Sequence, residues 1–256
     1  MRDAAIVATA RTAVGKAFRG AFNDTPAPVL SAHVVNAVLD RSGIDPARVD
    51  DVYMGTGSQW ASQGFNFGRM TAIASKLPLE VAGMTLDRKC SSGLNAIALA
   101  ARAIRSDEVD VAIAAGAESI SMTMGPYAPK AKSEAQIVLQ GDPYTYMAMI
   151  ETAEIVADRY GISREAQDAF AAQSQQRAGA GQAAGRFNDE IVPITVSMAL
   201  RDKEGNETGR KDVTLTADEG VRADTTAEGL SGLRPVFKDG LVVKEGKHVT
   251  AGNASQ

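Results

Sequence analysis

Short apolar runs alternate with longer segments of helical periodicity over the first 120 residues of this chain. Residues 91–104 carry Leu94, Ile97 and further apolar residues along one stripe of a helix. Residues 109–115 (VDVAIAA) then form an apolar run, which is typical of a strand covered on both faces. Strands that alternate with helices predict parallel β-α-β units, so the expected fold class is α/β.

The same patterns give a set of expected elements along the whole chain. We expect strands at 5–8, 52–55, 81–86 and 109–115, and helices at 28–39, 70–76, 91–104, 151–160 and 164–178. Ser163 is a candidate N-cap for the last helix, and Glu165 is favourably placed in its first turn. Residues 178–185 (AGAGQAAG) predict a loosening helix end, the charged segment 201–210 a hairpin or exposed loop, and 249–255 a strand followed by a turn.

Composition and charge exclude several classes of function. Hydrophobic residues make up 45% and charged residues 23% of the 256 residues, as in soluble globular proteins. A net charge of -4 argues against a nucleic-acid surface spread over the fold. No apolar run approaches the roughly 18 residues that cross a bilayer. The one cysteine allows no intramolecular disulfide. We therefore expect a cytoplasmic protein with no nucleic-acid or membrane partner.

Cys90 is the residue with the sharpest chemical signal. It lies between an expected strand and an expected helix, in the segment 87–95 (DRKCSSGLN). The first-turn amides and the dipole of a helix stabilise a thiolate, and Arg88 and Lys89 add to this if their charges point inward. Gly93 leaves room for a ligand or a second strand. The alternative is an inert buried cysteine, which is the commoner role of a lone cysteine.

Motifs along almost the whole chain resemble one known family. In order, they are IVATART at 6–12, NFGR at 66–69, DRKCSSGLN at 87–95, AGAES at 115–119, TAE at 152–154, SREAQD at 163–168, RADTT at 222–226 and VTAGNAS at 249–255. Together these segments resemble the thiolases, the degradative and biosynthetic β-ketoacyl-CoA thiolases of fatty acid metabolism.

The resemblance implies a particular division of the fold. The expected architecture is a thiolase-like N-terminal domain, a mixed five-stranded sheet with helices on both faces, with an inserted α+β loop domain. On this basis residues 1–120 form the α/β core and 248–256 return to it. Residues 121–247 form the loop domain, which binds CoA and the acyl group and makes oligomer contacts.

The resemblance also implies a reaction. Cys90 attacks an acyl-CoA thioester, keeps the acyl group and releases CoA. A second acetyl-CoA then attacks the acyl-enzyme to form a β-ketoacyl-CoA, and the reverse reaction cleaves one. Covalent catalysis suits a thioester exchange, and oxyanion holes must hold the developing charge. The implied substrates and partners are acyl-CoA molecules, no cofactor or metal is implied, and the expected assembly is a homodimer or homotetramer.

Four substrate-binding residues are implied by the resemblance alone. Arg222 is implied at the adenine nucleotide end of CoA, Ala251 and Ser255 beside its pantetheine arm, and Met149 in the acyl pocket. Each also has a plainer interpretation. Arg222 is a solvated or surface-paired arginine, Ser255 an ordinary turn residue, and Met149 a core filler.

The sequence departs from the family pattern in places. Ala148 stands where the family often has histidine, Ala13 where proline is usual, and 125–146 diverges in a stretch that governs tetramer contacts and part of the acyl pocket. Thiolases continue into a second α/β domain that supplies the activating histidine and a second cysteine. We do not expect His33 or His248 to replace that histidine, because a base must reach the thiol.

Three functions therefore compete. The first is a thiolase whose remaining part is absent or on another chain. The second is a truncated, non-catalytic thiolase-like protein that binds CoA or dimerises without turnover. The third is a decarboxylating ketoacyl synthase, which the thiolase-like motifs between 152 and 237 disfavour.

Overall fold

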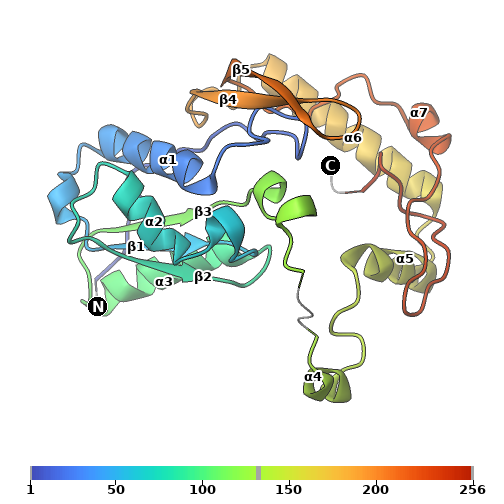
Figure 1. Ribbon diagram of the computed structural model, residues 1–256, viewed down its shortest axis with the longest axis horizontal. Helices are drawn as coiled ribbons and strands as arrows, with labels where there is room; N and C mark the ends of the chain where they lie inside the picture. Colours follow the sequence, from blue (N-terminus) through green and yellow to red (C-terminus); the bar gives the residue numbers. More distant parts are fainter. Residues whose placement is uncertain (1, 131–133, 255–256) are drawn as a thin grey trace. The chain divides into compact units, whose positions relative to one another are not determined.

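The computed structural model describes residues 2–130 and 134–254, and they form two compact units (Figure 1). The first unit contains Met1–Pro129 and Phe187–Glu219, and the second contains Lys130–Arg186 and Gly220–Gln256. None of the helices in the described part of the chain is long and apolar enough to cross a membrane.

A three-stranded parallel sheet forms the centre of the first unit. Its order is β2 (Ala82–Leu86), β1 (Asp51–Gly55), β3 (Ala112–Gly116). Gly55 pairs with Leu86 on one side and with Gly116 on the other. The three strands therefore end in line, so the loops that come after them meet at one edge of the sheet.

Helices cover both faces of this sheet (Figure 1). They are α1 (Ala27–Ser42), α2 (Phe67–Ala74) and α3 (Ser92–Arg105). Val52 packs with residues of α1 and α2, whereas its neighbour Tyr53 packs with the alanines of α3. Successive side chains of a strand point to opposite faces, which explains this alternation. The expected α/β class, with helices on both faces, is confirmed.

The expected mixed five-stranded sheet differs from the observed one. Among the residues that the structure describes, the sheet of the first unit has three strands, all parallel, and a separate antiparallel pair is formed by β4 (Ile194–Arg201) and β5 (Glu207–Leu215). The strand expected at 5–8 has no partner among the described residues, and Ile6 and Val7 are exposed. Pairing begins only at Arg11, which makes an isolated bridge to Ile191.

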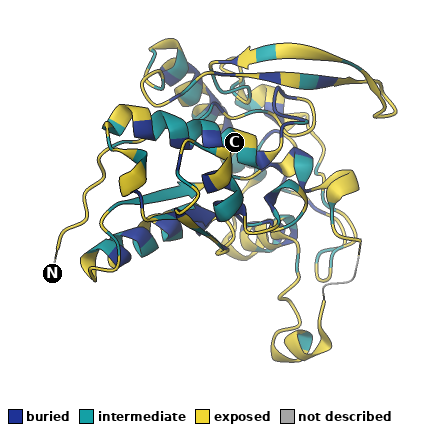
Figure 2. Ribbon diagram, turned by 60° about the vertical axis from the view of Figure 1, so that its left-hand side comes forward, coloured by how far each residue is buried: buried dark blue, intermediate teal, exposed yellow. Residues whose placement is uncertain are grey.

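The β4–β5 hairpin confirms the expectation for 201–210, since its turn spans the residues between the two strands. Buried and exposed residues alternate over the first half of β4 (Figure 2). Its buried residues Ile194 and Val196 pack with Ala13, Ala21 and Phe22. The hairpin therefore groups with the first unit.

The second unit is built mainly from helices and long loops. Its helices are α4 (Gln136–Gly141), α5 (Met149–Tyr160), α6 (Arg164–Ala183) and α7 (Ala227–Ser231). The hydroxyl of Ser163 accepts a hydrogen bond from the Ala166 amide at 3.2 Å, so the expected N-cap is confirmed. α6 runs further than expected, through most of the low-complexity segment 178–185. The short 3₁₀ helices of the first unit are η1 (Pro46–Arg48), η2 (Ala61–Gln63), η3 (Ile120–Met122) and η4 (Gly125–Tyr127).

The two units have other bounds than the expected division at 120 and 247. Residues 187–219 group with the first unit, and 248–254 group with the second. Residues 248–254 group with the second unit because the Val249 amide donates to the buried Glu154 carboxylate of α5 at 2.8 Å. The division by function remains a prediction.

Candidate active site

Cys90 lies in a tight turn between β2 and α3. The residue before it, Lys89, has a left-handed backbone with φ of 51°. The buried Ser92 hydroxyl holds this turn, because it accepts from the Arg88 amide at 2.9 Å and donates to the Lys89 carbonyl at 2.6 Å. Asp87 also contributes by accepting from the Lys89 amide at 2.6 Å. The turn is therefore fixed by residues on both sides of Cys90.

The Cys90 side chain is exposed and directly precedes Ser91, the N-cap of the 14-residue helix α3. The charge expected to assist it is partly engaged elsewhere, since Lys89 Nζ lies 2.8 Å from Asp87 Oδ2. Burial raises the pKa of Asp87, but hydrogen bonds from the Lys89 side chain and amide lower it more, so the net shift is downward. The N-terminus of α3 is a favourable place for an anion beside Cys90. Lys89 contributes less, because its charge is paired with Asp87.

Small residues at the sheet edge let α3 approach the strands closely. A Cβ atom on Gly55, the last residue of β1, would overlap the backbone of Ser92. A Cβ on Gly116, the last residue of β3, would lie 3.1 Å from the Cα of Gly93. A strand does approach Gly93, but a Cβ on Gly93 itself would lie 3.9 Å from the Gly116 Cα, which is ordinary contact, so the glycines of the strands allow the approach. This approach brings the Cys90 turn to the carboxyl end of the sheet.

A polar network fixes the loop after β1. The wholly buried Gln63 side chain donates to Glu118 Oε1 at 2.7 Å and accepts from the Ser119 amide at 2.5 Å. Glu118 in turn accepts from the Gly57 amide at 2.7 Å. Lys89 Nζ donates to the Gly57 carbonyl at 3.2 Å. The network therefore connects the ends of β1 and β3 to the residue that precedes Cys90.

In the second unit, α6 holds the segments that contain Arg222 and Ala251. The Arg222 amide donates to Gln175 Oε1 at 2.7 Å. The Asn253 side chain donates to Asp168 Oδ1 at 2.8 Å. Asp168 and Gln175 are seven residues apart, so they share one face of the helix. Two segments implied in CoA binding thus attach to the same face of α6.

The turn at 250–254 has its own internal bonds. Asn253 Oδ1 accepts from the Thr250 amide at 2.8 Å, and Asn253 Nδ2 also donates to the His248 carbonyl at 2.9 Å. Thr250 is fully buried, whereas Ala251 is exposed at the tip. Ser255, the other residue implied beside pantetheine, lies outside the described residues.

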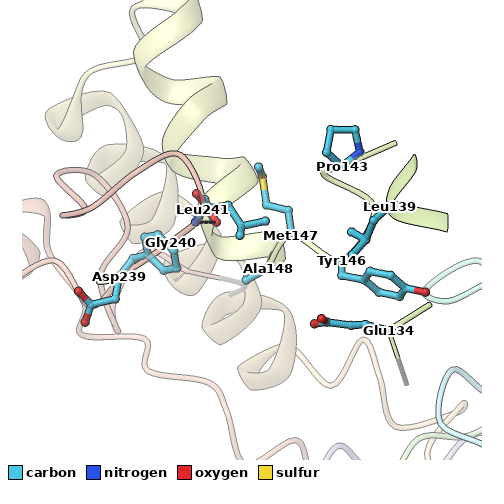
Figure 3. A pocket seen from close by; sticks show the side chains of 11 residues that line it. Glu134, Leu139, Pro143, Tyr146, Met147, Ala148, Asp239, Gly240 and Leu241 are labelled. Atoms are coloured by element: carbon cyan, nitrogen blue, oxygen red, sulfur yellow. Dashed lines mark hydrogen bonds between the residues drawn. The ribbon is translucent and has the colours of Figure 1, made fainter. Parts of the chain in front are cut away.

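Met149, implied in the acyl pocket, is the first residue of α5 and is 80% exposed. The residues directly before Met149 line a cavity of about 320 Å³. Its lining includes Tyr146, Met147 and Ala148 from this segment and Gly240 and Leu241 from another (Figure 3). Met149 is not among the residues that line this cavity. Cys90 belongs to the first unit, and Met149, Arg222 and Ala251 belong to the second.

Neither histidine is hydrogen-bonded to Cys90 in the described part of the chain. His33 lies in α1, and its Nε2 is buried with no hydrogen-bond partner among the residues described. His248 Nε2 lies 2.9 Å from Asp158 Oδ1. This hydrogen bond is the leading cause of the lowered pKa of Asp158. Among the described residues, no three His, Cys, Asp or Glu side chains gather to form a metal site.

Comparison with known proteins shows the family of this chain. The sequence model described as "Thiolase, N-terminal domain" matches residues 4–256. The match covers nearly the whole chain, and the chain belongs to the thiolase family.

Individual relatives support the same family. The chain is 42% identical over 257 residues to a 3-ketoacyl-CoA thiolase of Bacillus subtilis (strain 168), covering 100% of this chain and 63% of the relative. It is 41% identical over 267 residues to an acetyl-CoA acetyltransferase of Pseudomonas aeruginosa, with the same coverage. The crystal structure of the Bacillus anthracis acetyl-CoA acetyltransferase matches with a TM-score of 0.79 at 33% identity, covering 99% of this chain and 62% of that one. The chain thus spans less than two thirds of these relatives.

Sequence reasoning missed the polar residues that hold the loops and turns of the two units. Gln63, Glu151, Glu154, Asp168 and Gln175 are buried, and Glu118 is an exposed partner of Gln63. Several lie within recognised motifs, but polarity alone places such residues on solvent-facing helix surfaces. The available signal was spacing, since Glu151 and Glu154 share a helix face with the buried Ala157.

Proposed function

We propose that this chain carries the nucleophile and part of the CoA-binding surface of a thiolase-type acyltransferase. The observation that supports this most is the Cys90 turn, in which an exposed thiol directly precedes the N-cap of α3. A helix N-terminus stabilises an anion, and the fixed turn removes the need to organise the sulfur during reaction.

In the proposed reaction the Cys90 thiolate attacks the carbonyl carbon of an acyl-CoA thioester. The new bond joins that carbon to Sγ, and the bond from the carbon to the CoA sulfur breaks. CoA leaves as a thiolate and takes up a proton. The oxygen charge that develops in between needs fixed donors, and the Cys90 backbone amide is suited to be one of them. Acetyl-CoA, deprotonated at its methyl carbon, then takes the acyl group and forms a β-ketoacyl-CoA.

On the substrate side, we assign Arg222 to the nucleotide end of CoA, Ala251 and Ser255 to pantetheine, and Met149 to the acyl group. The exposure of Ala251 and Met149 leaves them accessible to a ligand. We further propose that the protein works in the cytoplasm as a homodimer or homotetramer, with acyl-CoA molecules as its partners. It would need no cofactor, nucleic acid or membrane.

Intact-protein mass spectrometry tests the proposal. The chain is incubated with acetyl-CoA beside a Cys90→Ala variant, and CoA binding is followed by calorimetry. We expect a gain of one acetyl group in the wild type and none in the variant, with CoA bound by both. Binding without acylation would favour the non-catalytic CoA-binding protein. The absence of both acylation and binding would overturn the proposal for this chain.

A further inference from the structure

Two buried carboxylates on α5 accept hydrogen bonds from the backbone of a single loop, residues 241–249. Glu151 and Glu154 are each 1% exposed and lie three residues apart, so they point from the same face of the helix. Buried carboxylates are costly unless hydrogen bonds compensate for the lost water. Each of these two receives hydrogen bonds from consecutive backbone amides.

The two sets of bonds have the same pattern. Glu151 accepts from the amides of 241, 242 and 243 at 3.0, 2.5 and 2.9 Å. Glu154 accepts from the amides of 247, 248 and 249 at 2.9, 3.0 and 2.8 Å. Burial raises the pKa of Glu151, but its three backbone bonds lower it more, so the net shift is downward. Successive amides that converge on one anion form a nest, here filled by a side chain of the protein itself.

The loop contains two similar six-residue segments, one for each carboxylate. Residues 238–243 read KDGLVV and residues 244–249 read KEGKHV, so each six-residue unit places a glycine before its donors. A Cβ on Gly240 would lie 2.5 Å from Glu151 Oε1, and a Cβ on Gly246 would lie 2.8 Å from Glu154 Oε1. Only glycine allows the backbone to approach each carboxylate this closely.

The two sets of bonded amides lie in different parts of the loop. The amides held by Glu151 belong to a hairpin where Leu241 and Val242 are exposed. The amides held by Glu154 lead directly into the turn 250–254, which carries Ala251. Asp168 holds the far side of that turn through Asn253.

We propose that Glu154 is a positioning residue for CoA binding, which fixes the turn 250–254, while Glu151 only folds the hairpin. This inference rests on the proposed function, because it takes the turn as part of the CoA site. Glutamine at 154 has the same shape but no charge, and its amide group would face three backbone donors. The turn would lose its anchor on the α5 side while α5 itself remained intact.

The matched variants Glu154→Gln and Glu151→Gln separate positioning from general stability, because both change one buried carboxylate on the same face. We expect both to lower the melting temperature by similar amounts. We expect Glu154→Gln to weaken CoA binding about tenfold in calorimetry, the effect of losing one charge-assisted hydrogen bond, and Glu151→Gln to change it less than about twofold. Gly246→Ala and Gly240→Ala form a second pair if either glutamine variant fails to fold.

Hydrogen exchange of the amides in 249–254 is measured on the same variants. We expect faster exchange there with Glu154→Gln and wild-type exchange with Glu151→Gln. Equal loss of CoA affinity in the two variants, or equal exchange in 249–254, would overturn the inference. If the wild type does not bind CoA, the proposed function fails, and the exchange data still decide whether Glu154 holds the turn.

Discussion

In the first unit, the turn around Cys90 is held largely by its neighbours in sequence, since Ser92 and Asp87 bond to the backbone of Arg88 and Lys89. In the second unit, the turn 250–254 depends on side chains far away in the chain. Val249 and Asn253 bond to Glu154 and Asp168 across 95 and 85 residues. A nucleophile turn of the first kind forms wherever its strand and helix form. A turn of the second kind forms only after two helices and their buried carboxylates are in place.

Of the variants that test this contrast, the one that removes the Asp168 charge should lower the free energy of unfolding most. Asp168 is 2% exposed and lies 2.8 Å from Arg164 Nε. Breaking a buried ion pair on one side costs about 3–5 kcal/mol. We expect Asp168→Asn to lower the free energy of unfolding by this amount in urea titration and to weaken CoA binding.

Alkylation of Cys90 by iodoacetamide should keep its wild-type rate in the folded Asp168→Asn variant. Asp158→Asn is the matched control, because that carboxylate is exposed and its replacement should lower the free energy of unfolding far less. A clear change of the Cys90 alkylation rate in Asp168→Asn would show that the two turns are not independent.

The next largest loss of stability should come from changing Ser92, which lies in the first unit. Ser92→Ala removes the hydroxyl that bonds to Arg88 and Lys89 inside the turn. An unsatisfied buried backbone group costs about 1–3 kcal/mol. We expect a loss of stability in that range and an altered rate of Cys90 alkylation, with CoA affinity within about twofold of wild type.

Ser91→Ala is the control for Ser92. Ser91 stands at the N-cap of α3, but its side chain makes no capping hydrogen bond. Its replacement should leave stability within about 0.5 kcal/mol and the alkylation rate unchanged. If both variants behave alike, the Ser92 hydroxyl does not hold the turn.

Acid should weaken the Cys90 turn by a smaller amount. The pKa of Asp87 is lowered in the folded chain, so its charge stabilises the fold above the ordinary carboxyl pKa of about 3.9. That contribution is lost as pH falls through the lowered pKa. We expect wild type to be more stable than Asp87→Asn by about 1 kcal/mol or less near pH 6, with the difference shrinking below about pH 4 in urea titrations. A difference that grows in acid would refute the assigned shift.

The contrast also explains which features the sequence can predict. The strands at 52–55 and 81–86 and the helix at 91–104 are predicted correctly, with Cys90 between them, because these patterns are local. The strand expected at 5–8 is wrong, since strand formation depends on a partner and none is present among the described residues. Glu154 and Asp168 lie in recognised motifs, but spacing along the chain does not reveal their distant partners.

The central claim is that the Cys90 sulfur accepts the acyl group, and Lys89 makes this directly testable. Acyl-CoA molecules can also modify an exposed amine, and Lys89 is an exposed neighbour of Cys90. Trypsin cleaves after an unmodified Lys89 and releases the peptide 90–102, which carries Cys90 at its first position.

The measurement is peptide mass spectrometry after brief incubation with acetyl-CoA, in which hydroxylamine is added to or omitted from the intact protein before trypsin digestion, because a free amine on Cys90 would take over an acetyl group from its sulfur. The account predicts an acetyl group on peptide 90–102 that hydroxylamine removes, as expected of a thioester. An acetyl group that resists hydroxylamine and blocks cleavage after Lys89 would place the modification on the amine. That result, with no thioester on Cys90, would contradict the account.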